Sequence, residues 1–227
     1  MNVNNRSELY IVSTPIGNLK DITYRAIEVL SSVDLIASED TRRTKILLNH
    51  YGIKSKLVSY NDFNKEKVTP EILKKLEGNC SVALVSDSGT PGISDPLYYL
   101  VKKAIEKDVK IIPIPGPTAL IAGIVVSGQP NDRFVFEGFI PTKKGRNKRL
   151  LQLKEEKRTI ILFESPHRLL KTLEDLLTFL GNRKISIARE LTKIYEEIIR
   201  TDIESAIKLF SQKKPKGEFV LIINGKE

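Results

Sequence analysis

Short apolar segments alternate with segments of helical periodicity through the first half of the chain. The apolar segments have the length of buried strands and cover residues 9–13, 35–37, 57–60, 81–86 and 109–114. Between them, apolar residues recur every three or four positions at 22–33, 41–51 and 96–107, and a further helix is predicted to begin at Thr69–Pro70, with Thr69 as N-cap. This alternation predicts a mainly parallel sheet with helices on both faces.

The second half of the chain has a different order of elements. Strands are predicted at 134–139, 159–163, 184–188, 195–200 and 219–223, and helices at 150–157, 168–180 and 204–210. No helix separates the strands on either side of residues 190–195, so this sheet is predicted to be mixed. We place the boundary at Pro115-Gly116-Pro117, which gives an α/β protein with an N-terminal domain at 1–117 and a C-terminal domain at 118–227.

Charge and composition limit the classes of partner. The 227 residues include 37 Lys and Arg against 28 Asp and Glu, and this net charge of +9 favours a polyanionic partner such as nucleic acid. Cys80 is the one cysteine and only His50 and His167 accompany it, so we expect no disulfide and no metal site. The polar start of the chain and the lack of a long apolar run predict a cytoplasmic protein without a membrane span.

Three loops rich in glycine and proline follow predicted strands, at residues 14–18, 86–96 and 113–119. Glycine allows a backbone to approach a ligand closely, and proline fixes the turn that holds it there. A single loop of this kind is usually an ordinary tight turn. Three loops at the carboxyl edge of one parallel sheet favour a ligand pocket, because such sheets bind ligands beyond that edge.

The common motifs for known ligands are absent. The sequence has no G-x-G-x-x-G after a strand, no G-x-x-x-x-G-K-[ST] and no G-x-S-x-G, so it supports neither a dinucleotide site, nor a P-loop, nor a hydrolase nucleophile.

Longer motifs lie at residues 9–19, 34–42, 83–91, 115–117, 163–168, 188–193 and 216–222. They resemble those of the ribosomal RNA small subunit methyltransferase I family, within the tetrapyrrole methylase superfamily, and the resemblance extends over about residues 8–224. Glu39-Asp40-Thr41-Arg42 and Ala188-Arg189-Glu190-Leu191-Thr192-Lys193 are specific to this branch. Gly89-Thr90-Pro91 replaces the Gly-Asp-Pro of the tetrapyrrole branch, so side-chain contacts do not transfer directly to Thr90.

The resemblance implies a two-domain methyltransferase, usually a homodimer, that binds S-adenosyl-L-methionine in the cleft between its domains. The implied reaction is 2′-O-methylation of a cytidine in the decoding region of small-subunit (16S) ribosomal RNA, as RNA or as the assembled small subunit. The implied cofactor contacts are Pro15, Gly89, Thr90, Ile93, Thr118, Ala119, Phe163 and Arg189. Thr118 and Ala119 lie at a predicted helix start, where a carboxylate is favoured. Phe163 would pack near the adenine.

Methyl transfer to a ribose hydroxyl needs a base or a stabilising cation beside a weak nucleophile. The candidate catalytic residues are Asp87, Glu164, Glu190 and Lys193. The alternatives are a turn-forming role for Asp87 and a surface charge for Lys193. Glu39 and Asp40 precede a predicted helix, where they would act as caps.

Candidate RNA contacts lie in two basic segments. Arg42 and Arg43 follow the Glu-Asp-Thr motif, and Lys143, Lys144, Arg146, Lys148 and Arg149 are concentrated after Pro141. A solvated helix face is the alternative for the second segment. Aromatic residues make up 7% of the chain and do not alternate with these charges, so the sequence predicts no base-stacking platform.

Three functions are compatible with the sequence: a ribosomal RNA ribose methyltransferase, a methyltransferase for a tetrapyrrole of the precorrin or uroporphyrinogen type, and a nucleotide-binding module without activity. The basic segments and the branch motifs favour the first.

Overall fold

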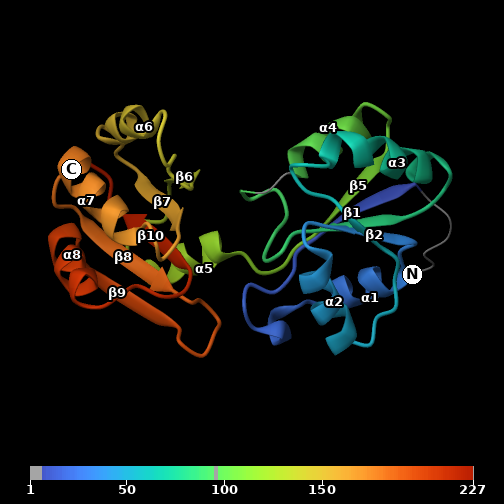
Figure 1. Ribbon diagram of the computed structural model, residues 1–227, viewed down its shortest axis with the longest axis horizontal. Coiled ribbons are helices and arrows are strands. Elements are labelled where there is room, and N and C mark those ends of the chain that lie inside the picture. Colours follow the sequence, from blue (N-terminus) through green and yellow to red (C-terminus); the bar gives the residue numbers. More distant parts are fainter. Residues whose placement is uncertain (1–6, 95–96, 227) are drawn as a thin grey trace. The chain divides into compact units, whose positions relative to one another are not determined.

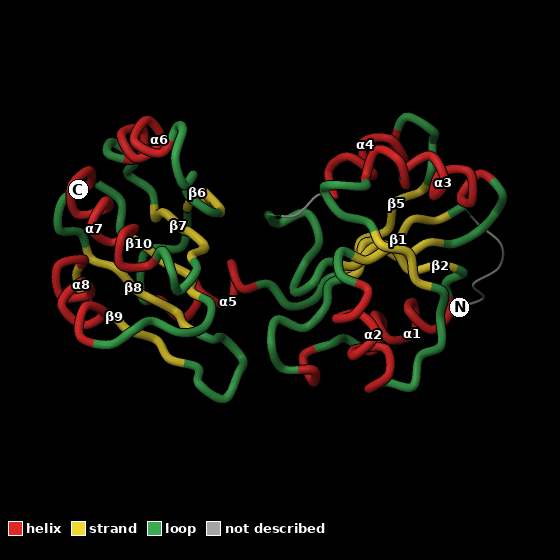
Figure 2. Tube along the Cα trace, in the orientation of Figure 1, coloured by secondary structure: helices red, strands yellow, loops and turns green. Residues whose placement is uncertain are grey.

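The computed structural model describes residues 7–94 and 97–226. The chain divides into two compact units, Met1–Thr118 (unit 1) and Ala119–Glu227 (unit 2). Figure 1 shows a separate sheet with its own helices in each unit, and Figure 2 shows the loops at the strand ends.

Unit 1 contains a five-stranded sheet in the order β3-β2-β4-β1-β5. Its strands are β1 (Glu8–Val12), β2 (Leu35–Ser38), β3 (Leu57–Ser59), β4 (Val82–Val85) and β5 (Lys110–Ile114). All pairs are parallel, as the alternation of strands and helices predicts. The carboxyl ends of β1, β2, β4 and β5 therefore lie at the same edge of the sheet.

Helices cover both faces of this sheet. In Figure 1, α1 (Tyr24–Ser32) and α2 (Thr41–His50) lie on one side, and α3 (Lys65–Glu77) and α4 (Leu97–Ile105) lie on the other. Alternate residues of the strands serve the two faces: Leu9 and Leu84 belong to the apolar cluster under α3 and α4, whereas Tyr10 and Ala83 belong to the one under α1 and α2. The strands are thus buried on both faces, which explains their continuous apolar sequences.

The start of α3 differs from the prediction. The helix begins at Lys65, so Pro70 lies inside it and Thr69 is not its N-cap. The reason is packing: Val68 is buried in the core, and the buried hydroxyl of Thr69 is 3.2 Å from that of Tyr60. Burial of this first turn outweighs the hydrogen bond that Pro70 cannot donate.

Unit 2 contains a mixed sheet in the order β6-β7-β10-β8-β9. Its strands are β6 (Phe134–Gly138), β7 (Thr159–Glu164), β8 (Lys184–Arg189), β9 (Glu197–Asp202) and β10 (Phe219–Ile223). β6 and β7 pair in parallel, and the other pairs are antiparallel. The predicted mixed sheet is confirmed.

Four helices complete unit 2: α5 (Ala119–Ser127), α6 (Arg146–Leu153), α7 (Leu169–Leu180) and α8 (Ile203–Gln212). The last three share an apolar cluster with alternate residues of the sheet, such as Leu162 and Leu221. α5 packs on the opposite face, where Gly123 lets the helix approach Val220 closely. α6 begins at Arg146 rather than at Leu150, because Gly145 (φ +87°) turns the chain and Leu150 and Leu153 then reach the core.

Within the described residues, every helix is too short or too polar to cross a membrane.

Candidate functional site

Two of the glycine-rich loops of unit 1 are joined by a pair of backbone hydrogen bonds. The Thr14 amide donates to the Gly89 carbonyl (2.9 Å), and the Gly89 amide donates to the Thr14 carbonyl (3.0 Å). Gly89 has φ +80°, a conformation that glycine adopts at little cost. The loops after β1 and β4 therefore form one structure at the carboxyl edge of the sheet.

The third loop, after β5, is attached to the first two by side chains. The Ser13 and Thr90 hydroxyls are 3.0 Å apart, and the Thr90 hydroxyl donates to the Pro117 carbonyl (3.1 Å). A Cβ atom on Gly116 would lie 2.9 Å from Cβ of Ser13, so these loops pack too closely for a side chain there. Because the Thr90 hydroxyl joins the loops, Gly89 and Thr90 would meet a ligand chiefly through their backbone. The end of the loop after β4, residues 95–96, lies outside the described residues.

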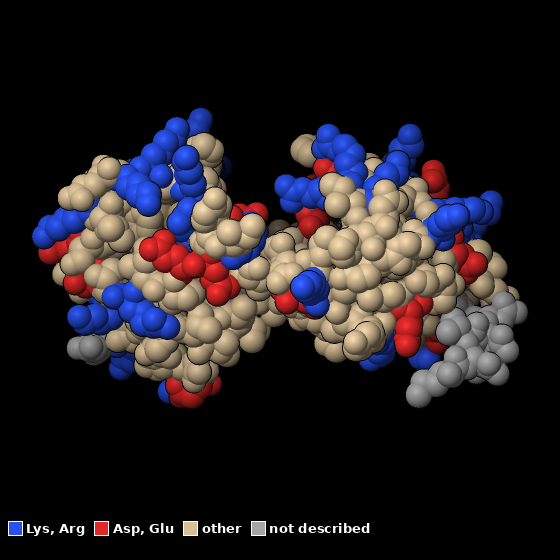
Figure 3. Space-filling model, turned by 90° about the horizontal axis from the view of Figure 1, so that it is seen from below, with Lys and Arg blue, Asp and Glu red and all other residues tan. Residues whose placement is uncertain are grey.

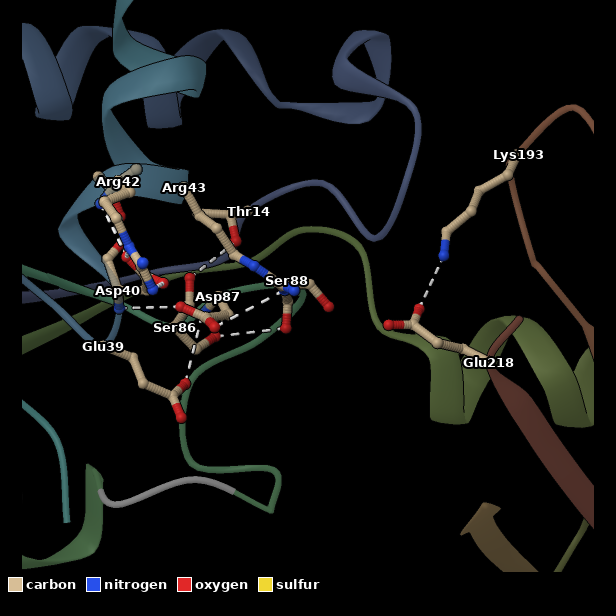
Figure 4. Close-up of polar contacts among 11 residues, drawn as sticks. Thr14, Glu39, Asp40, Arg42, Arg43, Ser86, Asp87, Ser88, Lys193 and Glu218 are labelled. Atoms are coloured by element: carbon tan, nitrogen blue, oxygen red, sulfur yellow. Dashed lines mark hydrogen bonds and ion pairs between the residues drawn. The ribbon is translucent and has the colours of Figure 1, made fainter. Parts of the chain in front are cut away.

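Asp87, at the end of β4, bonds to a neighbouring loop. Its Oδ1 accepts a hydrogen bond from the Asp40 amide (2.9 Å), and its Oδ2 lies 3.7 Å from Nη1 of Arg43 (Figure 4). The Asp87 amide in turn donates to Oε2 of Glu39 at 3.5 Å. The carboxylate of Asp87 is thus fixed between the loop after β2 and the first turn of α2.

Asp40 is the N-cap of α2, as its position before the helix predicts. Its carboxylate also accepts two hydrogen bonds from the Arg42 guanidinium, at 3.0 and 2.6 Å. The Arg42 side chain and amide lower the pKa of the Asp40 carboxyl far below its ordinary range. Arg42 is therefore already paired with a carboxylate, whereas the nearest carboxylate to Arg43 is Asp87.

A cavity of ≈ 130 Å³ lies beside this group of charges. Its lining residues come from the loop after β1, from α2 and from the end of β4: Thr14, Pro15, Leu19, Arg43, Thr44, Ile46, Leu47, Ser86 and Asp87. The lining combines apolar residues, among them Ile46 and Leu47, with the charged residues Asp87 and Arg43. Such a cavity suits a small group that is partly apolar and has a polar atom to place beside a carboxylate.

The residues expected to contact the cofactor are distributed over both units. In unit 1, Pro15 and Gly89 are buried, and Thr90, Ile93 and Thr118 are partly buried. In unit 2, Ala119 is the first residue of α5, and the Phe163 ring packs edge-on against Phe136 and Phe139. The Arg189 guanidinium donates to the Lys216 carbonyl (2.7 Å) and lies 3.3 Å from Glu197.

Glu190 and Lys193, after β8, form a polar cluster with Glu218, which precedes β10. The Lys193 ammonium bonds to Oε1 of Glu190 (2.8 Å) and to Oε2 of Glu218 (2.9 Å; Figure 4). The Glu218 amide donates to the same oxygen of Glu190 (2.9 Å). Lys193 is thus held by two carboxylates instead of pointing freely into solvent.

The charges in this cluster stabilise each other. Burial opposes the charged form of Lys193, but its hydrogen bonds to Glu190 and Glu218 outweigh burial and raise its pKa. Burial likewise opposes the charged form of Glu190, but bonds from Lys193 and the Glu218 amide lower its pKa. At neutral pH Lys193 is therefore a cation and Glu190 an anion, so this lysine suits charge stabilisation and not proton abstraction.

The backbone at this cluster is held in an unusual conformation. Glu190 and Thr192 have φ angles of 51° and 68°, which non-glycine residues seldom adopt. Strained residues of this kind gather at functional sites, where surrounding contacts compensate their cost. Here the Glu190 side chain packs directly on Gly217, since a Cβ atom at Gly217 would lie 2.4 Å from Cγ of Glu190.

Glu164, the remaining catalytic candidate, lies inside unit 2. Its carboxylate accepts hydrogen bonds from the Thr172 hydroxyl (2.6 Å) and the Ser165 amide (2.7 Å), and lies 3.4 Å from Nε of Arg168. Its side chain is 1% exposed. This geometry supports a role in holding β7 to α7.

The basic segment after Pro141 does not present all its charges to solvent. Arg146 is buried, with its guanidinium bonded to Asp175 (2.7 Å), Thr172 (3.0 Å) and the Pro141 carbonyl (3.0 Å). It differs in this from the exposed phosphate-binding residue that its sequence context indicates. Arg149 pairs with Glu137, while Lys143, Lys144 and Lys148 are exposed and make no ion pair with any described residue. On the face drawn in Figure 3, basic groups are interspersed with acidic ones.

Sequence patterns alone indicate no role for Gly217, Glu218 or Asp175. Lys216-Gly217-Glu218 stands in one of the motifs that carry the resemblance, so a signal was present, but nothing local connects it to Glu190. Asp175 lies three positions after Thr172 on one face of α7, and that spacing becomes informative only once α6 is placed beside it.

Comparison with known proteins agrees with the fold and motifs. The family model for tetrapyrrole (corrin/porphyrin) methylases matches residues 8–207. A protein of Synechocystis sp. named ribosomal RNA small subunit methyltransferase I is 55% identical over 219 residues, which are 96% of this chain and 78% of that protein. The chain belongs to this methyltransferase I group of the tetrapyrrole methylase family.

Other members of the family extend the comparison. A Thermotoga maritima protein of the same name is 50% identical and covers 97% of this chain and 99% of its own length. Among solved structures, a uroporphyrin-III-C-methyltransferase from Thermus thermophilus superposes with a TM-score of 0.68 at 16% identity, over 96% of this chain and 94% of that one. At that identity the likeness is one of fold.

The contact of Glu190 with Gly217 predicts the effect of a single added methyl group. Gly217→Ala should push the Glu190 carboxylate away from Lys193 and the Glu218 amide, and should lower the free energy of unfolding by ~1–3 kcal/mol more than a matched control. The control is Gly181→Ala, because Gly181 also has a positive φ (+82° against +95°) but nothing within 4 Å of its Cβ position. Denaturant unfolding measures both; equal losses would contradict this packing.

The buried position of Arg146 predicts a loss of stability. Arg146→Ala removes the buried hydrogen bonds of the guanidinium to Asp175, Thr172 and the Pro141 carbonyl, which should cost roughly 3 kcal/mol of unfolding free energy. Asp175 keeps only its ion pair with Lys171, and the Thr172 hydroxyl keeps only its bond to Glu164. Lys143→Ala, in the same basic segment but exposed, should change it by less than about 0.5 kcal/mol. A stable Arg146→Ala protein with weakened RNA binding would instead support an exposed role.

Proposed function

We propose that this protein transfers a methyl group from S-adenosyl-L-methionine to the 2′-hydroxyl of a cytidine in the decoding region of small-subunit ribosomal RNA. The observation that carries the proposal is the agreement, over almost the whole chain, with proteins named ribosomal RNA small subunit methyltransferase I. Residues of the two branch-specific motifs also take part in the polar groups described above: Asp40 bonds to Asp87, and Glu190 and Lys193 bond to Glu218.

The loops of unit 1 fit a cofactor that is recognised through backbone groups. The contacts of Thr14, Gly89, Thr90 and Pro117 hold the backbones of these loops in place, and Gly89 and Gly116 lack the side chains that would push the loops apart. Pro15, Gly89, Thr90, Ile93 and Thr118 would hold the cofactor from unit 1, and Ala119, Phe163 and Arg189 from unit 2. S-adenosyl-L-methionine would supply a methyl group on a positively charged sulfur.

The acceptor hydroxyl must lose its proton as its oxygen bonds to the methyl carbon. Asp87 is the proposed acceptor of that proton, because its carboxylate lines the small cavity of unit 1 and is fixed by the Asp40 amide. Arg43, beside it, would bind an RNA phosphate and keep the carboxylate in place. The protein's main contribution is to position the hydroxyl oxygen in line with the sulfur–methyl bond, which breaks as the oxygen–methyl bond forms and leaves the sulfur uncharged.

Lys193 is proposed to stabilise negative charge on the RNA. Its pKa is raised above the ordinary value of 10.5, so it carries its charge below that pH and loses it only as the pH rises through the higher value. Glu190 and Glu218 position the ammonium, and we assign Glu164 to the structure of unit 2. Of the exposed basic residues, Lys143, Lys144 and Lys148 are the proposed contacts to further phosphates.

The proposal includes three expectations from the family resemblance. The protein is expected to act in the cytoplasm, as a homodimer, and on ribosomal RNA or the assembled small subunit. The tetrapyrrole alternative has support only from a likeness of fold.

Transfer of a labelled methyl group tests the proposal. The substrates are undermodified small ribosomal subunits, naked small-subunit RNA and a uroporphyrinogen-type acceptor. Label is expected in the RNA of one of the first two. Label only in the tetrapyrrole would overturn the proposal, and cofactor binding without any label would indicate a binding module.

Substitution of the charged residues tests their roles. Asp87→Asn and Lys193→Met should each lower the rate about 100-fold or more, whereas Lys193→Arg should keep a larger share of it. Because Lys193 stays charged, the ratio of the Lys193→Met rate to the wild-type rate should be constant from about pH 6 to pH 9. The control is Lys103→Met, a lysine in an exposed ion pair with Glu106. A ratio that changes steeply near neutral pH would indicate that Lys193 acts as a base.

A further inference from the structure

A second cavity lies in unit 2, between the end of β6 and the first turns of α6. Its volume is ≈ 360 Å³. The residues that line it are Glu137, Phe139, Ile140, Pro141, Gly145, Lys148, Arg149 and Gln152. None of the roles proposed for Asp87 or Lys193 uses this cavity, which we call the β6–α6 pocket.

Two arginines bind backbone carbonyl groups of residues that line the β6–α6 pocket. The Arg168 guanidinium donates to the Ile140 carbonyl, and the Arg146 guanidinium donates to the Pro141 carbonyl (3.0 Å). Both arginines also bind buried groups of α7 and β7, through Asp175, Thr172 and Glu164. The pocket is therefore built on a rigid polar network, and little ordering is needed when a ligand enters.

An aromatic ring forms one side of the pocket. Phe139 is 51% exposed, and its ring packs edge-on against Phe163 at a centroid distance of 5.8 Å. Phe163 packs in the same way against Phe136 at 4.9 Å, so the exposed ring is supported from behind. Stacking of a flat partner on this exposed ring would remove apolar surface from water, which favours binding.

The other lining residues include polar and cationic ones. We call Glu137, Arg149 and Gln152 the polar wall, and Lys148 with the preceding Lys143 and Lys144 the cationic rim. Arg149 bonds to Glu137 and, through Nη1, to Oε1 of Gln152 (3.0 Å), so the wall presents both donors and acceptors. Lys148 lines the pocket, and Lys143 and Lys144 precede it in the loop; none of the three pairs with a carboxylate in the described part of the chain. Their charge is available to an anionic ligand.

We propose that the β6–α6 pocket binds one unpaired nucleotide of the RNA substrate, with its base stacked on Phe139 and its phosphate at Lys148. The inference rests on the proposed function, since it takes the substrate to be RNA. A flat aromatic base, polar edges and a phosphate match the ring, the polar wall and the cationic rim in turn. A base within a duplex cannot stack on the ring, so the nucleotide must be single-stranded or displaced.

Binding of a short unstructured RNA, measured by fluorescence anisotropy, tests the pocket. Phe139→Ala should weaken binding about tenfold, and Phe139→Tyr should keep most of the affinity, because tyrosine retains the aromatic ring that stacks on the base. Phe63→Ala is the matched control, since Phe63 is fully exposed in unit 1 and lines none of the cavities described here. Thermal unfolding of each variant separates loss of binding from loss of folding.

Two further measurements separate the contribution of the base to the binding affinity from that of the phosphate. With an RNA of the same length that lacks its bases, wild type and Phe139→Ala should bind equally. Lys148→Gln should weaken binding to both RNAs. It should also reduce the slope of log Kd against log salt concentration by about one, because one fewer phosphate is neutralised. An unchanged affinity of both Phe139→Ala and Lys148→Gln for the unstructured RNA would overturn the inference.

Failure of the inference can be distinguished from failure of the proposed function. If the wild-type protein methylates RNA and the Phe139 and Lys148 variants bind it normally, only the pocket assignment fails. If the wild-type protein binds no RNA and labels only a tetrapyrrole, the proposed function fails and the inference fails with it. Binding of S-adenosyl-L-methionine, measured by calorimetry, should be the same in Phe139→Ala and wild type; a parallel loss would assign the ring to the cofactor.

Discussion

The pair of backbone hydrogen bonds between Thr14 and Gly89 is the contact on which the candidate site of unit 1 depends. It joins loops that follow two adjacent parallel strands, β1 and β4, whose carboxyl ends the sheet already brings to one edge. The Ser13–Thr90–Pro117 contacts add the loop after β5, and the Asp87–Asp40 bond adds the loop after β2. Four strand ends are thereby fixed by a few short-range bonds, so the positions of Asp87 and Arg43 follow from the sheet order.

The Asp40–Asp87–Arg43 group of unit 1 and the Glu190–Lys193–Glu218 cluster of unit 2 are built differently. In unit 1, Asp87 is fixed by backbone groups and lies near a single arginine, at a distance that leaves its carboxylate accessible. In unit 2, Lys193 is enclosed by two carboxylates, and one of these is kept in place by the absence of a side chain at Gly217. The second arrangement keeps the ammonium of Lys193 charged. Under the proposed function, Asp87 would accept the proton of the hydroxyl group and Lys193 would stabilise negative charge on the RNA.

Much of the fold and part of the site could be predicted from the sequence. The strands and the N-cap at Asp40 are encoded by neighbouring residues, and periodicity and capping rules describe them well. The predicted start of α3 at Thr69–Pro70 was wrong, because burial of Val68 and Thr69 outweighs the local signal of Pro70. The burial of Arg146 was missed for a similar reason: its partners Thr172 and Asp175 are more than twenty residues away, and in a run of basic residues nothing local distinguishes it from Lys148.

The network of Arg146, Thr172, Glu164 and Arg168 has a consequence for how this protein can change over time. Each member binds a charge or hydroxyl of another, and a lone replacement removes a hydrogen bond or ion pair from a buried polar group. Such residues are expected to be inherited as a set, and to be replaced, if at all, by several simultaneous changes that convert the whole network to apolar packing. Exposed residues nearby, such as Lys148, can be replaced one at a time without leaving the network incomplete, so the shape of this region can persist while its binding properties change.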